Sequence, residues 1–112
     1  MNILSLYDQD SGVISYSNGE ASMRFEMPDH EDGTALIVNN TADSAATVTV
    51  KAGNSIYAMG DLTVSVAASA TAVINLKNSG RFKNVHGENS GKVAVTISGV
   101  TASLVKLCVI AL

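Results

Sequence analysis

A short acidic segment holds the most obvious candidate for metal chemistry. Residues 29–32 have the sequence Asp-His-Glu-Asp, so each of these side chains could donate a ligand. Consecutive side chains point in different directions along a strand or loop, and their spacing matches neither an EF-hand loop nor an HExxH helix. We therefore predict no metal site and interpret the segment as a solvated acidic loop.

Nucleophilic catalysis has candidate residues but no supporting motif. The sequence lacks a Gly-x-Ser-x-Gly elbow, and both histidines, His30 and His86, fall in predicted loops. The single cysteine, Cys108, lies in the apolar run 105–112, which predicts a buried thiol rather than a nucleophile and allows no internal disulfide. We predict that the protein is not an enzyme and binds no cofactor. A small lyase or hydrolase is the least favoured alternative.

A few aromatic and basic residues are instead candidates for contacts with a partner. The segment 81–83 is a small version of the basic and aromatic pattern of nucleic-acid interfaces, but an isoelectric point near 5.1 disfavours that partner. The alternative interpretation is the start of a strand, with Phe82 inward and the two bases exposed. Sugar binding is disfavoured because the chain has no tryptophan. The candidate interface residues are Tyr7, Tyr16, Arg81, Phe82 and Lys83.

The charge distribution suggests a surface that meets other molecules. Only 15% of the 112 residues are charged, against about 25% in typical soluble proteins. Residues 1–50 carry eight acids and one base, a net charge of −7, whereas residues 51–112 carry two acids and six bases, a net charge of +4. Such a division predicts a partner surface or head-to-tail contacts between copies. For the division of charge, the alternative is that the fold interleaves the two halves so that their charges mix. For the low charge content, the alternative is that Ser, Thr and Asn supply the polar face.

Alternating apolar and polar residues dominate the chain, a pattern typical of half-buried β-strands. It covers residues 23–27, 47–51, 61–66, 74–77 and 92–98. The apolar run 35–38 predicts a central strand, and the run 103–112 predicts a strand or a short helix, with its β-branched residues favouring the strand. We therefore predict an all-β fold, namely an antiparallel β-sandwich (Ig-like or jelly-roll-like) or a small barrel, of about eight strands.

The chain length fits a single domain. Residues 1–20 are the least patterned and predict an N-terminal arm or an edge hairpin, while residues 21–112 form the predicted β-sandwich domain. The first residues lack the basic start of a signal peptide, and no apolar run approaches the roughly 20 residues of a membrane helix. We therefore expect production in the cytoplasm and no membrane partner.

Four segments, taken in order, resemble a pattern in small structural proteins encoded among the head genes of tailed bacteriophages, the capsid decoration (head auxiliary or cement) proteins. The segments are TVTVKAGN (47–54), GDLTVSV (60–66), SGRFKN (79–84) and GKV (91–93). The resemblance covers residues 36–112. The sequence departs from this pattern at Ser55, where a glycine is expected, and the segment 86–87 lies in a turn that varies.

The resemblance implies a structural virion protein that binds the outer surface of a phage capsid and stabilises or decorates it, without catalytic residues. The implied partners are the major capsid protein and further copies of the chain in a homo-oligomer, for which a trimer is one arrangement; no nucleic acid is implied. Such a protein is assembled in the cytoplasm of the bacterial host and ends on the capsid surface of the virion. The alternative is a phage head-fibre or adhesin-type module that contacts a host surface or glycans.

Overall fold

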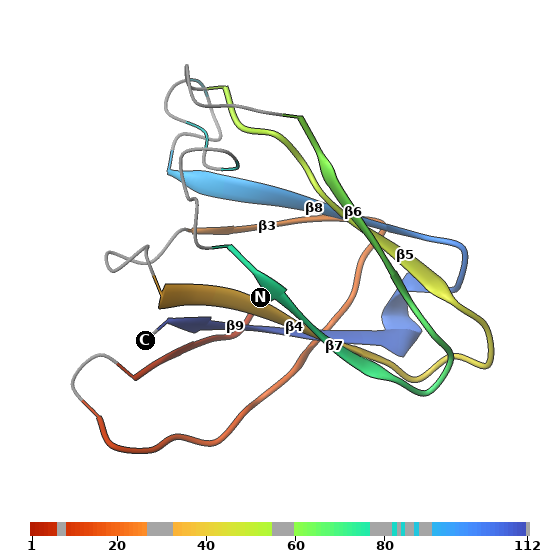
Figure 1. Cartoon of the computed structure of the whole chain (residues 1–112), viewed down its shortest axis with the longest axis horizontal. Helices are drawn as coiled ribbons and strands as arrows, with labels where there is room; N and C mark the ends of the chain where they lie inside the picture. The colour runs from red at the N-terminus through yellow and green to blue at the C-terminus, as the bar shows by residue number, and fades with distance from the viewer. Residues whose placement is uncertain are drawn as a thin grey trace.

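The computed structural model describes residues 1–6, 9–26, 33–54, 60–76, 82, 84, 87 and 91–111. Within these residues, nine strands form two sheets that pack face to face (Figure 1). The first sheet consists of β1 (Ile3–Ser5), β2 (Ser17–Asn18), β4 (Thr34–Asn40), β7 (Thr71–Asn75) and β9 (Val105–Ala111). The second sheet consists of β3 (Ser22–Glu26), β5 (Ala46–Val50), β6 (Leu62–Val66) and β8 (Lys92–Ser98).

The strands pair in a nested order. Strand β5 pairs with β6, β4 with β7, β3 with β8 and β2 with β9, all antiparallel. Lateral pairs β4–β9 and β5–β8 complete the two sheets, in the orders β1-β9-β4-β7 and β3-β8-β5-β6. Folding one long hairpin over into two sheets produces this arrangement, which is that of a jelly roll. The predicted all-β sandwich is confirmed, and among its alternatives the strand order matches the jelly roll.

The core lies between the sheets and follows the alternation of the sequence. In β8, Val93, Val95 and Ile97 are buried while the residues between them are partly exposed. Valine dominates because its branched side chain packs well on a pleated surface. The buried apolar cluster consists of Met23, Phe25, Leu36, Val38, Ala46, Val48, Val50, Val66, Ile74, Leu76, Phe82, Val93, Val95, Ile97, Val105, Leu107 and Val109.

Most predicted strands lie close to the observed ones. Strand β4 is central, as predicted, because β7 and β9 bond to its two edges. Residues 105–111 form a strand, preceded by a short 3₁₀ helix η2 (Ala102–Leu104), so the helical alternative for the C-terminal run is wrong. Strand β7 covers Thr71–Asn75, whereas the alternation predicted a strand over residues 74–77. The start was missed because Ala72 is too small to mark an inward-facing position clearly.

The buried side-chain amide of Asn40 connects the segment between β4 and β5 to the end of β6. The Asn40 side chain is fully buried at the end of β4. Its Nδ2 donates to the carbonyl oxygens of Ser44 at 2.9 Å and Val66 at 3.0 Å, and its Oδ1 accepts from the Ala42 N–H at 3.0 Å. These bonds satisfy the buried amide, as a polar group in an apolar core requires. They fix the chain between β4 and β5 against the end of β6.

Candidate functional site

The N-terminal segment completes the edge of the first sheet. Strand β1 runs parallel to β9 beside residues 109–111, and β2 runs antiparallel to β9 beside residues 106–107. The backbone bonds Val109 N–H to Asn2 carbonyl at 3.0 Å and Gly19 N–H to Val105 carbonyl at 2.7 Å fix the two strands in place. The predicted arm or edge hairpin thus consists of two short strands that each pair with β9.

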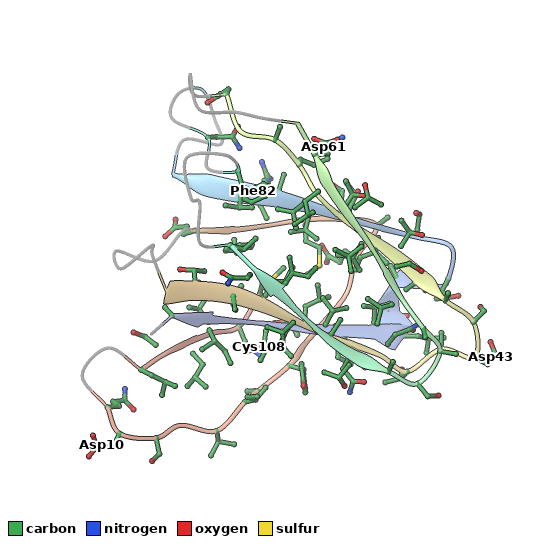
Figure 2. The ribbon with its side chains drawn as sticks, in the orientation of Figure 1. Asp10, Asp43, Asp61, Phe82 and Cys108 are labelled. Atoms are coloured by element: carbon green, nitrogen blue, oxygen red, sulfur yellow. The ribbon has the colours of Figure 1, made fainter. Side chains whose placement is uncertain are left out.

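Residues 9–16, between these strands, fold back onto the outer face of the same sheet. A Cβ atom added to Gly12 would lie 2.7 Å from Leu4 Cδ1 and 2.9 Å from Leu6 Cδ2, so the Gly12 backbone packs directly on these side chains. Below this segment, a small cavity of about 120 Å³ reaches Cys108, which is fully buried as predicted. Figure 2 marks Cys108 on the first sheet.

This segment exposes three apolar side chains to solvent. Val13 is 87% exposed, Ile14 40% and Tyr16 37%. We call Val13, Ile14 and Tyr16 the N-terminal apolar patch. A cluster of exposed apolar residues on a soluble protein commonly marks a contact with another molecule.

Among the other predicted interface residues, the structure describes Phe82 and places it inside the molecule. Phe82 is 2% exposed and belongs to the core, which agrees with its inward alternative and removes its ring from the surface (Figure 2). Tyr7, Arg81 and Lys83 lie outside the described residues, as do the acidic loop 29–32 and His86. Tyr16 is therefore the predicted interface residue that the structure describes as exposed.

Charged residues from the two halves of the chain meet at one sheet edge. The register of β3 with β8 places Glu26 opposite Lys92, so acidic and basic halves interleave there.

Elsewhere, Asp61 accepts hydrogen bonds from the Ala52 N–H at 2.7 Å and from Lys51 Nζ at 2.9 Å. These bonds, that of Ala52 first, lower the pKa of the Asp61 carboxyl. Its ion pair with Lys51 is half-exposed and neutralises charge locally.

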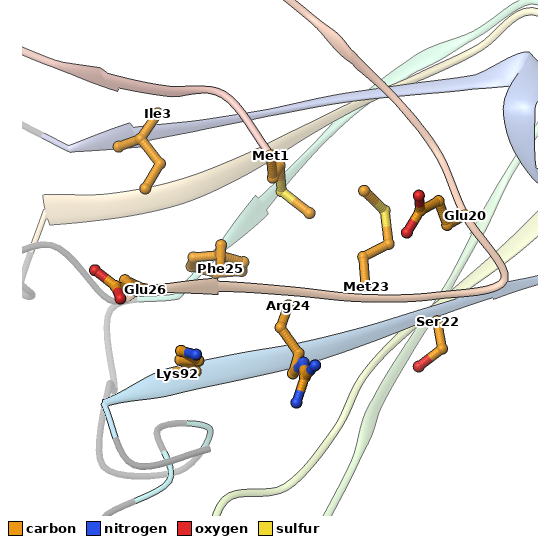
Figure 3. A pocket seen from close by; sticks show the side chains of 9 residues that line it. All are labelled: Met1, Ile3, Glu20, Ser22, Met23, Arg24, Phe25, Glu26 and Lys92. Atoms are coloured by element: carbon orange, nitrogen blue, oxygen red, sulfur yellow. The ribbon is translucent and has the colours of Figure 1, made fainter. Parts of the chain in front are cut away.

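A groove of about 500 Å³ opens between the sheets, where β1 faces β3. Figure 3 shows the side chains of Met1, Ile3, Met23 and Phe25 pointing into the space between the strands, whereas Arg24 points away. Glu20, Ser22, Glu26 and Lys92 complete its lining. The groove has the volume of a small-molecule site, but its exposed lining is mainly polar and carries both signs of charge, whereas such sites are usually lined by apolar side chains.

The described residues include neither a metal-ligand cluster nor a membrane-spanning helix. Among them, no group of three or more His, Cys, Asp or Glu residues is placed to hold a metal ion. In the same ranges, no helix is long and apolar enough to cross a membrane. No protein-family model, curated protein or solved structure matches this chain.

Sequence reasoning missed the most exposed apolar residues. Val13 and Ile14 lie in a segment without periodicity, and only their position beside Gly12 and Ser15 hinted at a loop. Val73, 66% exposed, was detectable in principle, because the inward positions Ile74 and Leu76 place odd-numbered residues on the opposite face. The groove between β1 and β3 depends on pairings that no local pattern encodes.

Proposed function

We propose that this protein is a structural virion protein that binds the outer surface of a tailed-bacteriophage capsid and stabilises or decorates it. The observation that carries the proposal is the N-terminal apolar patch, which is exposed to solvent and lies between two strands that pair with β9. Its partner in this proposal is the major capsid protein. The protein acts at the virion surface after assembly in the bacterial cytoplasm.

The fold is compatible with this role. Jelly rolls occur in viral capsid proteins and also in lectins and cupins, so the fold supports the proposal only by analogy. The strands within the segments that resemble decoration proteins are β5, β6 and the start of β8, all in the second sheet. The N-terminal apolar patch lies between β1 and β2 of the first sheet. The patch and the resembling segments therefore lie on different sheets of the molecule.

Binding to undecorated capsids tests the proposal. We expect the purified protein to saturate such capsids at a fixed number of copies per capsomer. A variant with Val13, Ile14 and Tyr16 all changed to Ser should lose at least about tenfold in affinity, since each buried apolar side chain contributes roughly 1.5–3 kcal/mol. Val73→Thr, which removes exposed apolar surface from the far edge of the same sheet, is the matched control and should bind like the wild type.

The salt dependence of capsid binding shows whether apolar contacts or charges drive the docking. Apolar docking through the patch predicts an affinity that changes little as salt is added, whereas docking by opposed charges predicts weaker binding at high salt. Failure of the wild-type protein to bind capsids at any salt concentration contradicts the proposal.

A head-fibre or adhesin-type module that contacts a host surface or glycans is the second candidate. The groove between β1 and β3 is the feature that suits it. The aromatic residue of that groove, Phe25, is only 4% exposed, so its ring is poorly placed to stack on a sugar. Specific retention of the protein on host cells or glycans, without capsid binding, would favour this candidate.

A further inference from the structure

One side of the sandwich is built from an uncharged stretch of chain. Residues 62–76 contain no charged residue, no proline and no glycine. This stretch forms β6 and β7, the edge strands of the two sheets, joined by a turn at residues 67–70. Proteins usually protect sheet edges with charges, prolines or bulges, because an unprotected edge pairs with another strand. The composition of 62–76 therefore marks this side as one that another chain covers.

The hydrogen bonds of β7 show which backbone groups face outward. The Asn40 N–H donates to the Ala70 carbonyl at 2.9 Å, and the Leu76 N–H donates to the Thr34 carbonyl at 3.0 Å. Antiparallel pairing alternates, so the even-numbered residues of β7 bond to β4 and the odd-numbered ones face the other way. The N–H and C=O groups of Thr71 and Val73 thus point to the open edge, since among the described strands β7 pairs only with β4.

The side chains of this edge match a second copy of themselves. Val73 lies on the outer face beside Ile37, and its side chain is the most exposed apolar group of either sheet in the described ranges. Polar residues, Thr71 and Asn75, lie two positions before and after it. An antiparallel copy centred on Val73 sets valine against valine and threonine against asparagine, and it opposes no like charges.

We propose that β7 pairs antiparallel with β7 of a second copy, about a two-fold axis at Val73. Val73 of each copy donates its N–H to the Val73 carbonyl of the other, and the two first sheets become one continuous sheet. Only an extended strand can satisfy backbone groups spaced in this way, which identifies the occupant as a strand rather than a helix or a small molecule. The symmetry of the edge about Val73 identifies that strand as the chain's own.

The other edges are less suited to this pairing. Strand β3 carries Arg24 and Glu26, so an approaching strand must accommodate two charges. The outer edge of β9 is already paired with β1 and β2. Strand β6 is uncharged like β7, but its Val64 is less exposed than Val73. Pairing through β7 closes at two copies, in contrast to a trimer.

Sedimentation of the full chain, without capsids, tests the proposal. From micromolar to millimolar concentration, the mass should rise from 11.6 kDa towards twice that value. Val73→Lys places a charge against its own copy and should weaken dimerisation at least about tenfold, because like charges directly opposite each other destabilise strand pairs. Leu104→Lys is the matched control: it adds the same charge at an exposed leucine of η2 and should dimerise like the wild type.

A second variant and a second readout guard against misfolding. Thr71→Pro removes an N–H that faces the open edge, so it breaks no backbone bond to β4 and loses only the long side-chain bond to Asn39. This variant should also remain monomeric. In the wild type, exchange of the Val73 amide hydrogen should slow as protein concentration rises. A wild-type chain that stays at the monomer mass at millimolar concentration overturns the proposal, as does a Val73→Lys variant that dimerises like Leu104→Lys. Capsid binding by a monomer would leave the proposed function intact.

Discussion

At the scale of single residues, Asn40 combines complete burial with complete hydrogen bonding. Replacing it with alanine removes the amide from three carbonyl oxygens, those of Ser44, Val66 and Ala67, and from one N–H. Each buried group left unsatisfied costs about 1–3 kcal/mol. We expect Asn40→Ala to lower the free energy of unfolding by about 3 kcal/mol or more, measured by urea denaturation.

The neighbouring asparagine provides the control. Asn39 lies on the outer face of β4, where its Oδ1 accepts a long hydrogen bond, 3.4 Å, from Thr71 Oγ1. Asn39→Ala should therefore cost less than about 1 kcal/mol. Equal costs at the two positions would show that the Asn40 bonds do not tie the turns together.

Gly19 is required because other parts of the chain come close to its Cα. A Cβ atom there would lie 2.5 Å from the Ala102 carbonyl oxygen and 2.8 Å from that of Val105, and backbone oxygens cannot rotate away. Gly19→Ala should cost about 3 kcal/mol, from overpacking and from the strained N–H bond to Val105, as measured by thermal unfolding.

Gly60 provides the control, because an alanine there has a strained backbone but no close neighbours. A Cβ atom at Gly60 meets nothing within 4 Å, but φ is +94°. Gly60→Ala should therefore cost only the roughly 1–2 kcal/mol of a left-handed backbone. A Gly19→Ala variant as stable as Gly60→Ala would contradict the close packing of residue 19 on β9.

At the scale of elements, β1 and residues 9–16 protect the outer face of β9. Leu4, Val13 and Ser15 line the small cavity next to Cys108. Leu4→Ala enlarges that cavity, so iodoacetamide should label the native Cys108 thiol several-fold faster than in the wild type. Ile14→Ala, which leaves the lining of the cavity unchanged, is the control, and mass spectrometry measures both. Equal labelling rates in the two variants would mean that β1 does not shield the thiol.

The strands themselves were predictable, but their partners were not. Alternation located β3, β5, β6 and β8 because each has one buried face, and the apolar run of β4 marked its central position. The N-terminal segment was undefined because β1 and β2 owe their conformation to β9, which lies 88 to 106 residues away in sequence. Local pattern therefore predicts which residues form strands, whereas distant pairing decides which side chains reach the surface.

The same limit applies to the candidate site. Tyr16 was predicted as an interface residue from its type, and it is exposed; Phe82 was chosen on the same ground, and it lies in the core. Residue type alone cannot separate these cases, because an aromatic side chain suits both a core and an interface. Exposed Val13 and Val73 were missed for the converse reason, since apolar residues are expected inside.

At the scale of the whole molecule, the jelly roll brings opposite ends of the chain together. Lys106 Nζ donates to Asn18 Oδ1 at 2.6 Å across 88 residues of sequence, beside the β2–β9 pair. The innermost hairpin, β5–β6, can form locally, and each further pair spans a longer separation. Long-range pairing of this kind slows folding.

The nested order also constrains the chain while it is being synthesised. Strand β4 is made well before β9, which covers one of its edges. Until then the nascent chain holds an apolar strand with an open edge, a feature that promotes aggregation. A cell that produces many copies at once therefore depends on rapid synthesis of the segment from β4 to β9. Products truncated before residue 105 are the species that chaperones and proteases must remove.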